Sequence, residues 1–261
     1  MNKKMLVKSL VGLVLAAAVI PMFLYGGMAV QILVLAAVLL AAYEIASLPD
    51  RKPHWVMTLF LGAAIELMGH MPDTQFACAA ALFLSILIVI CLFHEPFVID
   101  SAVYTYFISM ILVLAMQAIS RVYVSGLGGT VILYVGFACF ICDTGAYFFG
   151  SFMGKHKMIP RVSPNKTWEG FVGGYLAGLA VSYVFGRYFC PALPGSLLLA
   201  GSIVLPAVGA VGDLAFSLIK RRYGIKDYGS LLPGHGGVLD RIDSLLFCLM
   251  VFNAMLIFWG F

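Results

Sequence analysis

Apolar stretches of about twenty residues recur along the whole chain and are separated only by short polar breaks. A helix of that length crosses the hydrocarbon core of a bilayer, where each backbone polar group must be hydrogen-bonded within the protein. Hydrophobic residues make up 62% of the 261 residues and charged residues only 11%, too little polar surface for a water-soluble globule. The sequence therefore predicts an all-α polytopic membrane protein.

We expect about nine transmembrane helices in this chain. They lie near residues 6–24, 28–46, 55–71, 74–93, 101–120, 129–150, 168–189, 197–219 and 242–260. The first has the basic head of a signal peptide but no small-residue cleavage site after its apolar stretch, so we expect it to be retained.

Lys and Arg residues set the expected orientation, because positive charges near span ends resist translocation. With a cytoplasmic N-terminus, fourteen of the sixteen lie inside and only Arg121 and Arg187 lie outside. Loop 94–100, also inside, has no Lys or Arg and does not follow this bias. The same bias accounts for the net charge of +4, which therefore gives no reason to expect a nucleic-acid partner.

The two halves of the chain differ in kind. Residues 1–130 are spans rich in Ala, Leu, Val and Ile, and we expect them to form a lipid-facing scaffold. Residues 131–261 hold most of the charges within spans and the long polar loops, so we expect the catalytic region there. A small residue at every fourth position from Gly170 to Gly186 predicts close helix packing, within one chain or across a dimer.

Two aspartates lie inside predicted spans at the same depth. Asp143 is seven residues before Gly150, and Asp213 is seven residues before Lys220, which places each about 10 Å below one surface. Charges persist in a bilayer mainly where they face a polar cavity or a partner. The pair predicts a cation site, and the alternative is two separate ion pairs or backbone contacts. Glu44 could reach the interface from a span end, and we assign it no role.

Polar residues near the same surface have the pattern of a phosphate site. Asp213, Ser217 and Lys220 fall on one helical face at i, i+4 and i+7. Ser163 and Pro164 are typical of a helix N-cap and first turn, which would put Lys166 beside a helix N-terminus; the alternative is an ordinary capped membrane helix.

The segment 217–243 reads SLIKRRYGIKDYGSLLPGHGGVLDRID. It resembles the signature of the phosphatidate cytidylyltransferase (CDP-diacylglycerol synthase) family, without departure from that pattern. Segments 143–147, 163–170 and 212–213 also match the family, whereas the first half resembles it only in its hydrophobic profile.

The resemblance implies a nucleotidyltransferase that joins CTP and phosphatidate into CDP-diacylglycerol and diphosphate, with Mg²⁺ and room for a second cation. It implies membrane lipids as surroundings, a homodimer, and a polar cavity open to the cytoplasm in a bacterial inner membrane. The implied catalytic residues are Asp213, Asp240, Lys220, Asp143 and Asp243, with Asp213, Asp240 and Asp143 as metal ligands. The implied binding residues for substrate phosphates are Ser163, Lys166, Thr167, Ser217, Lys220, Arg221, Lys226, His235, Gly236, Gly237 and Arg241.

Two other functions remain open at this point. A CTP-dependent lipid kinase would use a similar nucleotide site but transfer the γ-phosphoryl group to a lipid alcohol. An ion-coupled transporter would use Asp143 and Asp213 to bind its ion.

Overall fold

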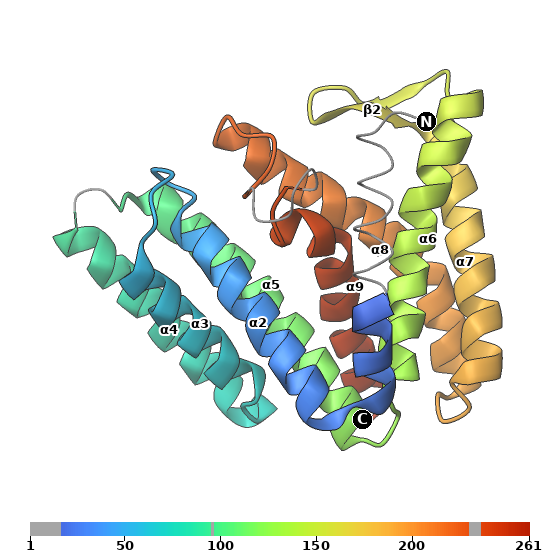
Figure 1. Cartoon of the computed structure of the whole chain (residues 1–261), viewed down its shortest axis with the longest axis horizontal. Helices are drawn as coiled ribbons and strands as arrows, with labels where there is room; N and C mark the ends of the chain where they lie inside the picture. Colours follow the sequence, from blue (N-terminus) through green and yellow to red (C-terminus); the bar gives the residue numbers. More distant parts are fainter. Residues whose placement is uncertain (1–16, 95–96, 230–235) are drawn as a thin grey trace.

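The computed structural model describes residues 17–94, 97–229 and 236–261, and these are almost entirely helical (Figure 1). Residues 17–25 are helical and precede eight further helices. These are α2 (Gly27–Ala46), α3 (Trp55–Gly69), α4 (Asp73–Phe93), α5 (Ile99–Val124), α6 (Thr130–Met153), α7 (Trp168–Phe189), α8 (Gly195–Arg222) and α9 (Leu239–Phe258). They coincide within a few residues with the eight predicted spans from 28–46 onward, which confirms the all-α class.

Among the described residues, six helices are long and apolar enough to cross a membrane: α2, α4, α5, α6, α8 and α9. Helix α3 has 15 residues and is therefore about 22 Å long, short of the roughly 30 Å hydrocarbon core. Helix α7 has 22 residues but a less apolar, glycine-rich sequence. The predicted span 6–24 lies mostly outside the described residues, so the total of nine stays a prediction.

The helices form two groups that meet at α9. Helices α2 to α5 lie on one side of the molecule and α6 to α8 on the other, while α9 packs between α5 and α8 (Figure 1). The end of α8 and the start of α9 face a two-stranded hairpin, β1 (Lys157–Ile159) and β2 (Ser163–Thr167), at one end of the bundle. This end carries the polar loops of the second half of the chain.

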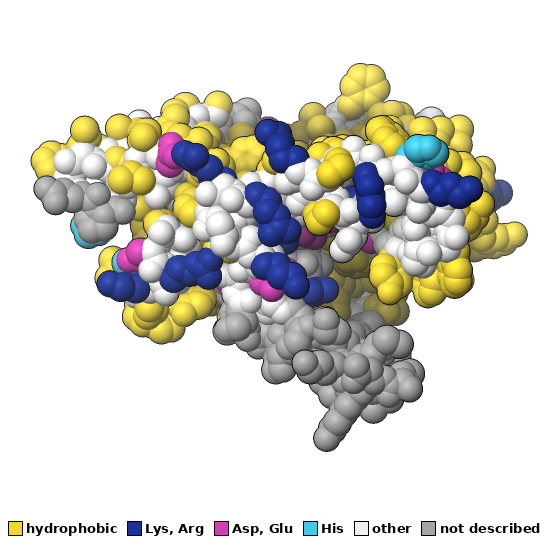
Figure 2. All heavy atoms as spheres, turned by 90° about the horizontal axis from the view of Figure 1, so that it is seen from above, with side chains coloured by type: hydrophobic (Ala, Val, Ile, Leu, Met, Phe, Trp, Pro, Cys, Tyr) yellow, Lys and Arg dark blue, Asp and Glu magenta, His cyan; other side chains and the backbone are white. Residues whose placement is uncertain are grey.

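Lys and Arg side chains spread across this end of the molecule (Figure 2). They belong to the loop between α2 and α3, the segment from the end of α6 through the hairpin, and the junction of α8 and α9: Arg51, Lys52, Lys155, Lys157, Arg161, Arg221, Arg222, Lys226 and Arg241. Asp100 lies here too, because its carboxylate is 2.5 Å from Arg222. The start of α5, although it lacks positive charge of its own, therefore lies at the basic end as predicted.

Helices α6 and α7 pack closely through the predicted stripe of small residues. Gly170, Gly174, Gly178, Ser182 and Gly186 are all buried. A Cβ atom at Gly174 would lie 2.6 Å from the backbone nitrogen of Ala146 in α6. The stripe thus packs within one chain, which settles the alternative left open by the sequence.

The prediction of a helix N-terminus at Ser163 and Pro164 is wrong. Residues 163–167 form β2, which pairs antiparallel with β1 in a register that sets Lys157 opposite Thr167. Helix α7 begins at Trp168, and the Thr167 hydroxyl caps it by accepting a hydrogen bond from the Gly170 amide at 3.2 Å. Strand pairing holds Ser163 extended, so Thr167 takes the capping role.

Replacing Gly174 with Ala should destabilise the protein, because backbone atoms of α6 cannot move aside unless the two helices separate. Overpacking of this kind costs about 1–3 kcal/mol and should lower the midpoint of thermal unfolding in detergent. Gly195→Ala is the matched control, since nothing lies within 4 Å of a Cβ there. Equal midpoints for the two variants would contradict the described packing.

Candidate functional site

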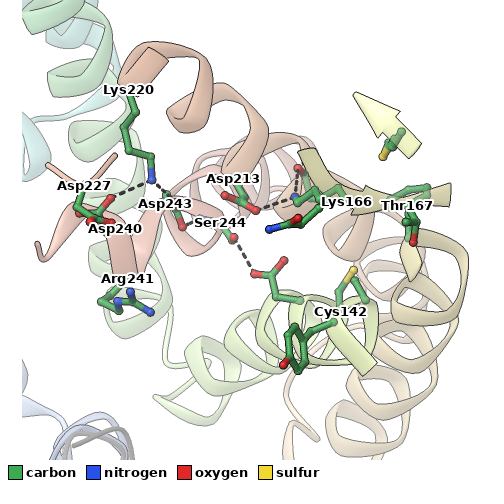
Figure 3. Close-up of a pocket in the computed structure, with 17 residues that line it drawn as sticks. Cys142, Lys166, Thr167, Asp213, Lys220, Asp227, Asp240, Arg241, Asp243 and Ser244 are labelled. Atoms are coloured by element: carbon green, nitrogen blue, oxygen red, sulfur yellow. Dashed lines mark hydrogen bonds and ion pairs between the residues drawn. The ribbon is translucent and has the colours of Figure 1, made fainter. Parts of the chain in front are cut away.

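A cavity of about 370 Å³ lies between α6, α8, α9 and the hairpin at the basic end of the bundle (Figure 3). Its wall combines five carboxylates with three basic side chains: Asp143, Asp213, Asp227, Asp240, Asp243, Lys166, Lys220 and Arg241. Thr167 and Ser244 also line it. Residues that are more than a hundred positions apart in the sequence thus meet in one polar space inside an apolar bundle.

Lys220 and Asp240 form the most buried ion pair of this cavity. The Lys220 Nζ lies 2.9 Å from Asp240 Oδ1 and 4.0 Å from Asp243 Oδ2, and the side chains of Lys220 and Asp240 are only 11% and 3% exposed. Asp240 Oδ2 accepts two backbone hydrogen bonds, from Tyr228 at 2.7 Å and Gly237 at 2.9 Å. Asp240 therefore connects α8, the loop after it and the first turn of α9.

The ring of Tyr228 packs near the Lys220 ammonium of this ion pair. The Lys220 ammonium lies 5.6 Å from the centre of its ring, within the range of a cation–π contact. Burial, together with the nearby charge of Asp240, raises the pKa of Tyr228. Its hydroxyl therefore stays protonated and donates a hydrogen bond to the Phe216 carbonyl at 3.2 Å.

A second ion pair, between Lys166 and Asp213, crosses the cavity from the hairpin to α8. The Lys166 Nζ is 2.7 Å from Asp213 Oδ2, with side chains 23% and 30% exposed. Ser217 donates to Asp213 Oδ1 at 3.4 Å, which confirms the predicted common face of α8. Because this pair is more open than the first, water and small anions can reach it.

Asp143 and Asp243 approach the same space from α6 and α9. Ser244 donates its hydroxyl to Asp143 Oδ2 at 2.8 Å, and the side chains of Asp143 and Asp213 both line the cavity. Asp143 and Asp213 therefore share one cavity, as the sequence predicts, although Asp213 also has a lysine partner.

The cavity contains eight of the residues that the sequence singled out: Asp143, Lys166, Thr167, Asp213, Lys220, Asp240, Arg241 and Asp243. Six others lie outside its lining: Ser163, Ser217, Arg221, Lys226, Gly236 and Gly237. Arg221 instead donates to the carbonyls of Val162 and Ile225, which ties the hairpin to the end of α8. Lys226 is exposed, and His235 lies outside the described residues.

Sequence reasoning missed an apolar side of the cavity and one buried acid. Tyr147, Met158 and Phe171 line the cavity together with its charged residues, which gives it both polar and apolar surface. Glu44 does not extend to the interface, because it is 1% exposed and accepts hydrogen bonds at the start of α9. Nothing in the local sequence distinguishes it from an interfacial glutamate.

Over residues 6–259 the sequence matches the profile of the Cytidylyltransferase family. The chain belongs to this family. Proteins named phosphatidate cytidylyltransferase from Staphylococcus haemolyticus, Staphylococcus saprophyticus and Staphylococcus aureus are 49%, 48% and 46% identical to it over 126 residues. Each match covers 48% of this chain and 48% of the relative, so the aligned chain spans about half the length of these curated relatives.

The carboxylate oxygens of the cavity are donor atoms that suit a divalent cation such as Mg²⁺. Within residues 17–94, 97–229 and 236–261, no three His, Cys, Asp or Glu side chains already form a metal-binding group. Mg²⁺, however, is usually bound by only one or two carboxylates, with substrate phosphates and water completing its shell. The carboxylates of Asp143 and Asp213 in one cavity fit that requirement.

The two lysines of this cytidylyltransferase-family chain should differ in their effect on stability. Lys220→Met leaves the buried Asp240 carboxylate without its charge partner, which costs about 3–5 kcal/mol for a buried pair. Lys166→Met breaks a more open pair and should cost less than about 1 kcal/mol. Thermal unfolding in detergent checks this order, and a larger loss for Lys166→Met would contradict the assigned burial.

Proposed function

We propose that this chain transfers the cytidylyl group of CTP to phosphatidate, giving CDP-diacylglycerol and diphosphate. Membership of the family supports a cytidylyl transfer, and the names of the relatives support phosphatidate as the acceptor. The observation that carries the proposal is the cavity itself, in which Lys166, Lys220 and Arg241 meet carboxylates at the basic end of a membrane bundle. Two phosphate-bearing substrates require such a concentration of charge.

The reaction joins two anions that repel each other. A phosphate oxygen of phosphatidate attacks the α-phosphorus of CTP, and the bond from that phosphorus to the oxygen bridging to the β-phosphate breaks. The diphosphate leaves with the electron pair of the broken bond. Because the attacking oxygen is already anionic, no general base is required, and the chief task of the protein is to position and neutralise charge.

The basic residues of the cavity perform that task in this proposal. Lys166 and Lys220 can exchange their carboxylate partners for phosphate oxygens, and Arg241 offers a planar set of donors. Backbone amides near Gly236 and Gly237 and the side chains of Ser163, Thr167, Ser217, Arg221, Lys226 and His235 stay proposed contacts for substrate phosphates. Asp243, 4.0 Å from the Lys220 ammonium, helps to hold that group in place.

Magnesium is the proposed cofactor, and its proposed ligands are one or two carboxylates from among Asp213, Asp240 and Asp143. When bound, it would neutralise phosphate charge and increase the electrophilicity of the α-phosphorus. Asp213 is the most accessible of the three, at 30% exposed. Asp240 would first have to release Lys220, because both of its oxygens already accept hydrogen bonds. A second cation beside it stays a proposal from the family resemblance.

The proposed location is a bacterial inner membrane, with the basic end of the bundle in the cytoplasm. The positive charges on that face support this orientation, since they resist translocation (Figure 2). CTP would then arrive from the cytoplasm while phosphatidate presents its phosphate at the interface. Residues 1–130 would serve as the scaffold and residues 131–261 as the catalytic region, and a homodimer stays a proposal from resemblance.

Product analysis tests the proposal against its alternatives. Purified protein in mixed micelles with phosphatidate, Mg²⁺ and CTP labelled on the α-phosphorus should give labelled lipid and unlabelled diphosphate. If labelled lipid formed only from CTP labelled on the γ-phosphorus, the result would favour the lipid kinase. No labelled lipid from well-folded protein, with ion-driven accumulation in sealed vesicles, would favour the transporter.

Asp213→Asn should lower kcat by about 100-fold or more, the usual loss when a group that stabilises the transition state is removed. Asp50→Asn is the matched control, because Asp50 lies at the same end but pairs with His54 outside the cavity. Chelation of Mg²⁺ with EDTA should abolish wild-type turnover, and added Mg²⁺ should restore it. Full turnover by Asp213→Asn would remove Asp213 from the proposed site.

A further inference from the structure

Glu44 is a buried acid for which the mechanism above has no role. It lies near the end of α2, in the half of the chain that was predicted to be scaffold, and it is 1% exposed. A charge buried in an apolar bundle costs several kcal/mol unless hydrogen bonds compensate it. Its surroundings therefore need an explanation.

Both oxygens of Glu44 accept hydrogen bonds from the start of α9. Oε1 accepts from the Val238 amide at 2.8 Å, and Oε2 accepts from the Leu239 amide at 2.9 Å. The first amides of a helix have no partner within that helix, and the N-cap side chain of α9, Val238, supplies none. Glu44 thus caps α9 from a helix about 200 residues earlier in the chain. Its negative charge also interacts favourably with the dipole of α9, whose N-terminus is positive.

The backbone around this cap approaches the carboxylate closely. A Cβ atom at Gly229 would lie 2.7 Å from Glu44 Oε1, and one at Gly237 would lie 2.6 Å from Glu44 Cδ. Gly237 in turn donates its amide to Asp240. One side chain of α2 therefore contacts the loop after α8 and the residues that lead into α9.

We propose that Glu44 is a positioning residue for the cavity, which it affects through the first turn of α9. The first two turns of α9 carry Asp240, Arg241, Asp243 and Ser244, all of which line the cavity. By fixing the amides of Val238 and Leu239, Glu44 sets where these side chains stand and how Asp240 holds Lys220. A displacement of about 1 Å in reacting groups can cost about 100-fold in rate. The catalytic consequence rests on the proposed function, whereas the positioning of the turn does not.

Glu44→Gln is the most direct variant, because it keeps the shape of the side chain. An amide has one acceptor oxygen, and its NH₂ group would face a backbone N–H, so one of the two helix amides loses its partner. Hydrogen exchange without substrates should become roughly tenfold faster or more at residues 238–239. The kcat per folded molecule, measured well below the unfolding midpoint, should fall by roughly tenfold.

Two further variants separate positioning from general stability. Glu66→Gln makes the same change in α3, away from the cavity, and should alter neither exchange at 238–239 nor kcat. Gly229→Ala keeps Glu44 but pushes a methyl group against its carboxylate, so it should reproduce both effects of Glu44→Gln. Gly229→Ala also tests the proposal if Glu44→Gln does not fold.

The outcomes are distinguishable. Unchanged exchange at residues 238–239 in Glu44→Gln and Gly229→Ala would overturn the proposal, whatever reaction the protein catalyses. Faster exchange with an unchanged kcat per folded molecule would overturn it as well, since Glu44 would then only stabilise the helix. A wild type that makes no CDP-diacylglycerol would contradict the proposed function, while the exchange data would still decide whether Glu44 positions the turn.

Discussion

The buried ion pair between Lys220 and Asp240 is the interaction on which the arrangement of the cavity depends. Neither charge could remain alone at 11% and 3% exposure, so each side chain holds the other in place. Asp240 further accepts the amides of Tyr228 and Gly237. The end of α8, the loop after it and the start of α9 are thereby fixed to one another, and the remaining charged groups are arranged around them.

Helix α9, whose first turn carries Asp240, also joins the two halves of the molecule. The charged groups that line the cavity come from α6, α8, α9, the hairpin and the loop after α8, yet α9 packs on α5, and its first amides are bound by Glu44 of α2. Close packing of α6 on α7 through a glycine stripe helps to place Asp143 of α6 and Lys166, just before α7, in the lining of one cavity. Two ion pairs, Lys166–Asp213 and Lys220–Asp240, offset part of the cost of placing these charges in an apolar bundle.

The sequence predicted the helices and most of the charged residues that line the cavity, and both predictions have physical reasons. Helices in an apolar solvent follow from local composition, and an aspartate such as Asp213 within a span has few explanations other than a polar cavity. The capping of α7 by Thr167 was not predictable, because it depends on the pairing of β2 with β1. The capping role of Glu44 was missed because its partners are about 200 residues away in the sequence. Arg221 was predicted to bind phosphate because it is positively charged, but its guanidinium donates to the Val162 carbonyl.

The central claim is that the nucleotide binds in the cavity between α6, α8 and α9. A structure of the protein determined with Mg²⁺ and a non-hydrolysable CTP analogue tests it most directly. The account predicts triphosphate density within contact of Lys166, Lys220 and Asp213, with Lys166 or Lys220 moved from its carboxylate to a phosphate oxygen. Triphosphate density at another site, such as the exposed basic residues Lys155 and Arg161, with both ion pairs of the cavity intact, would contradict it.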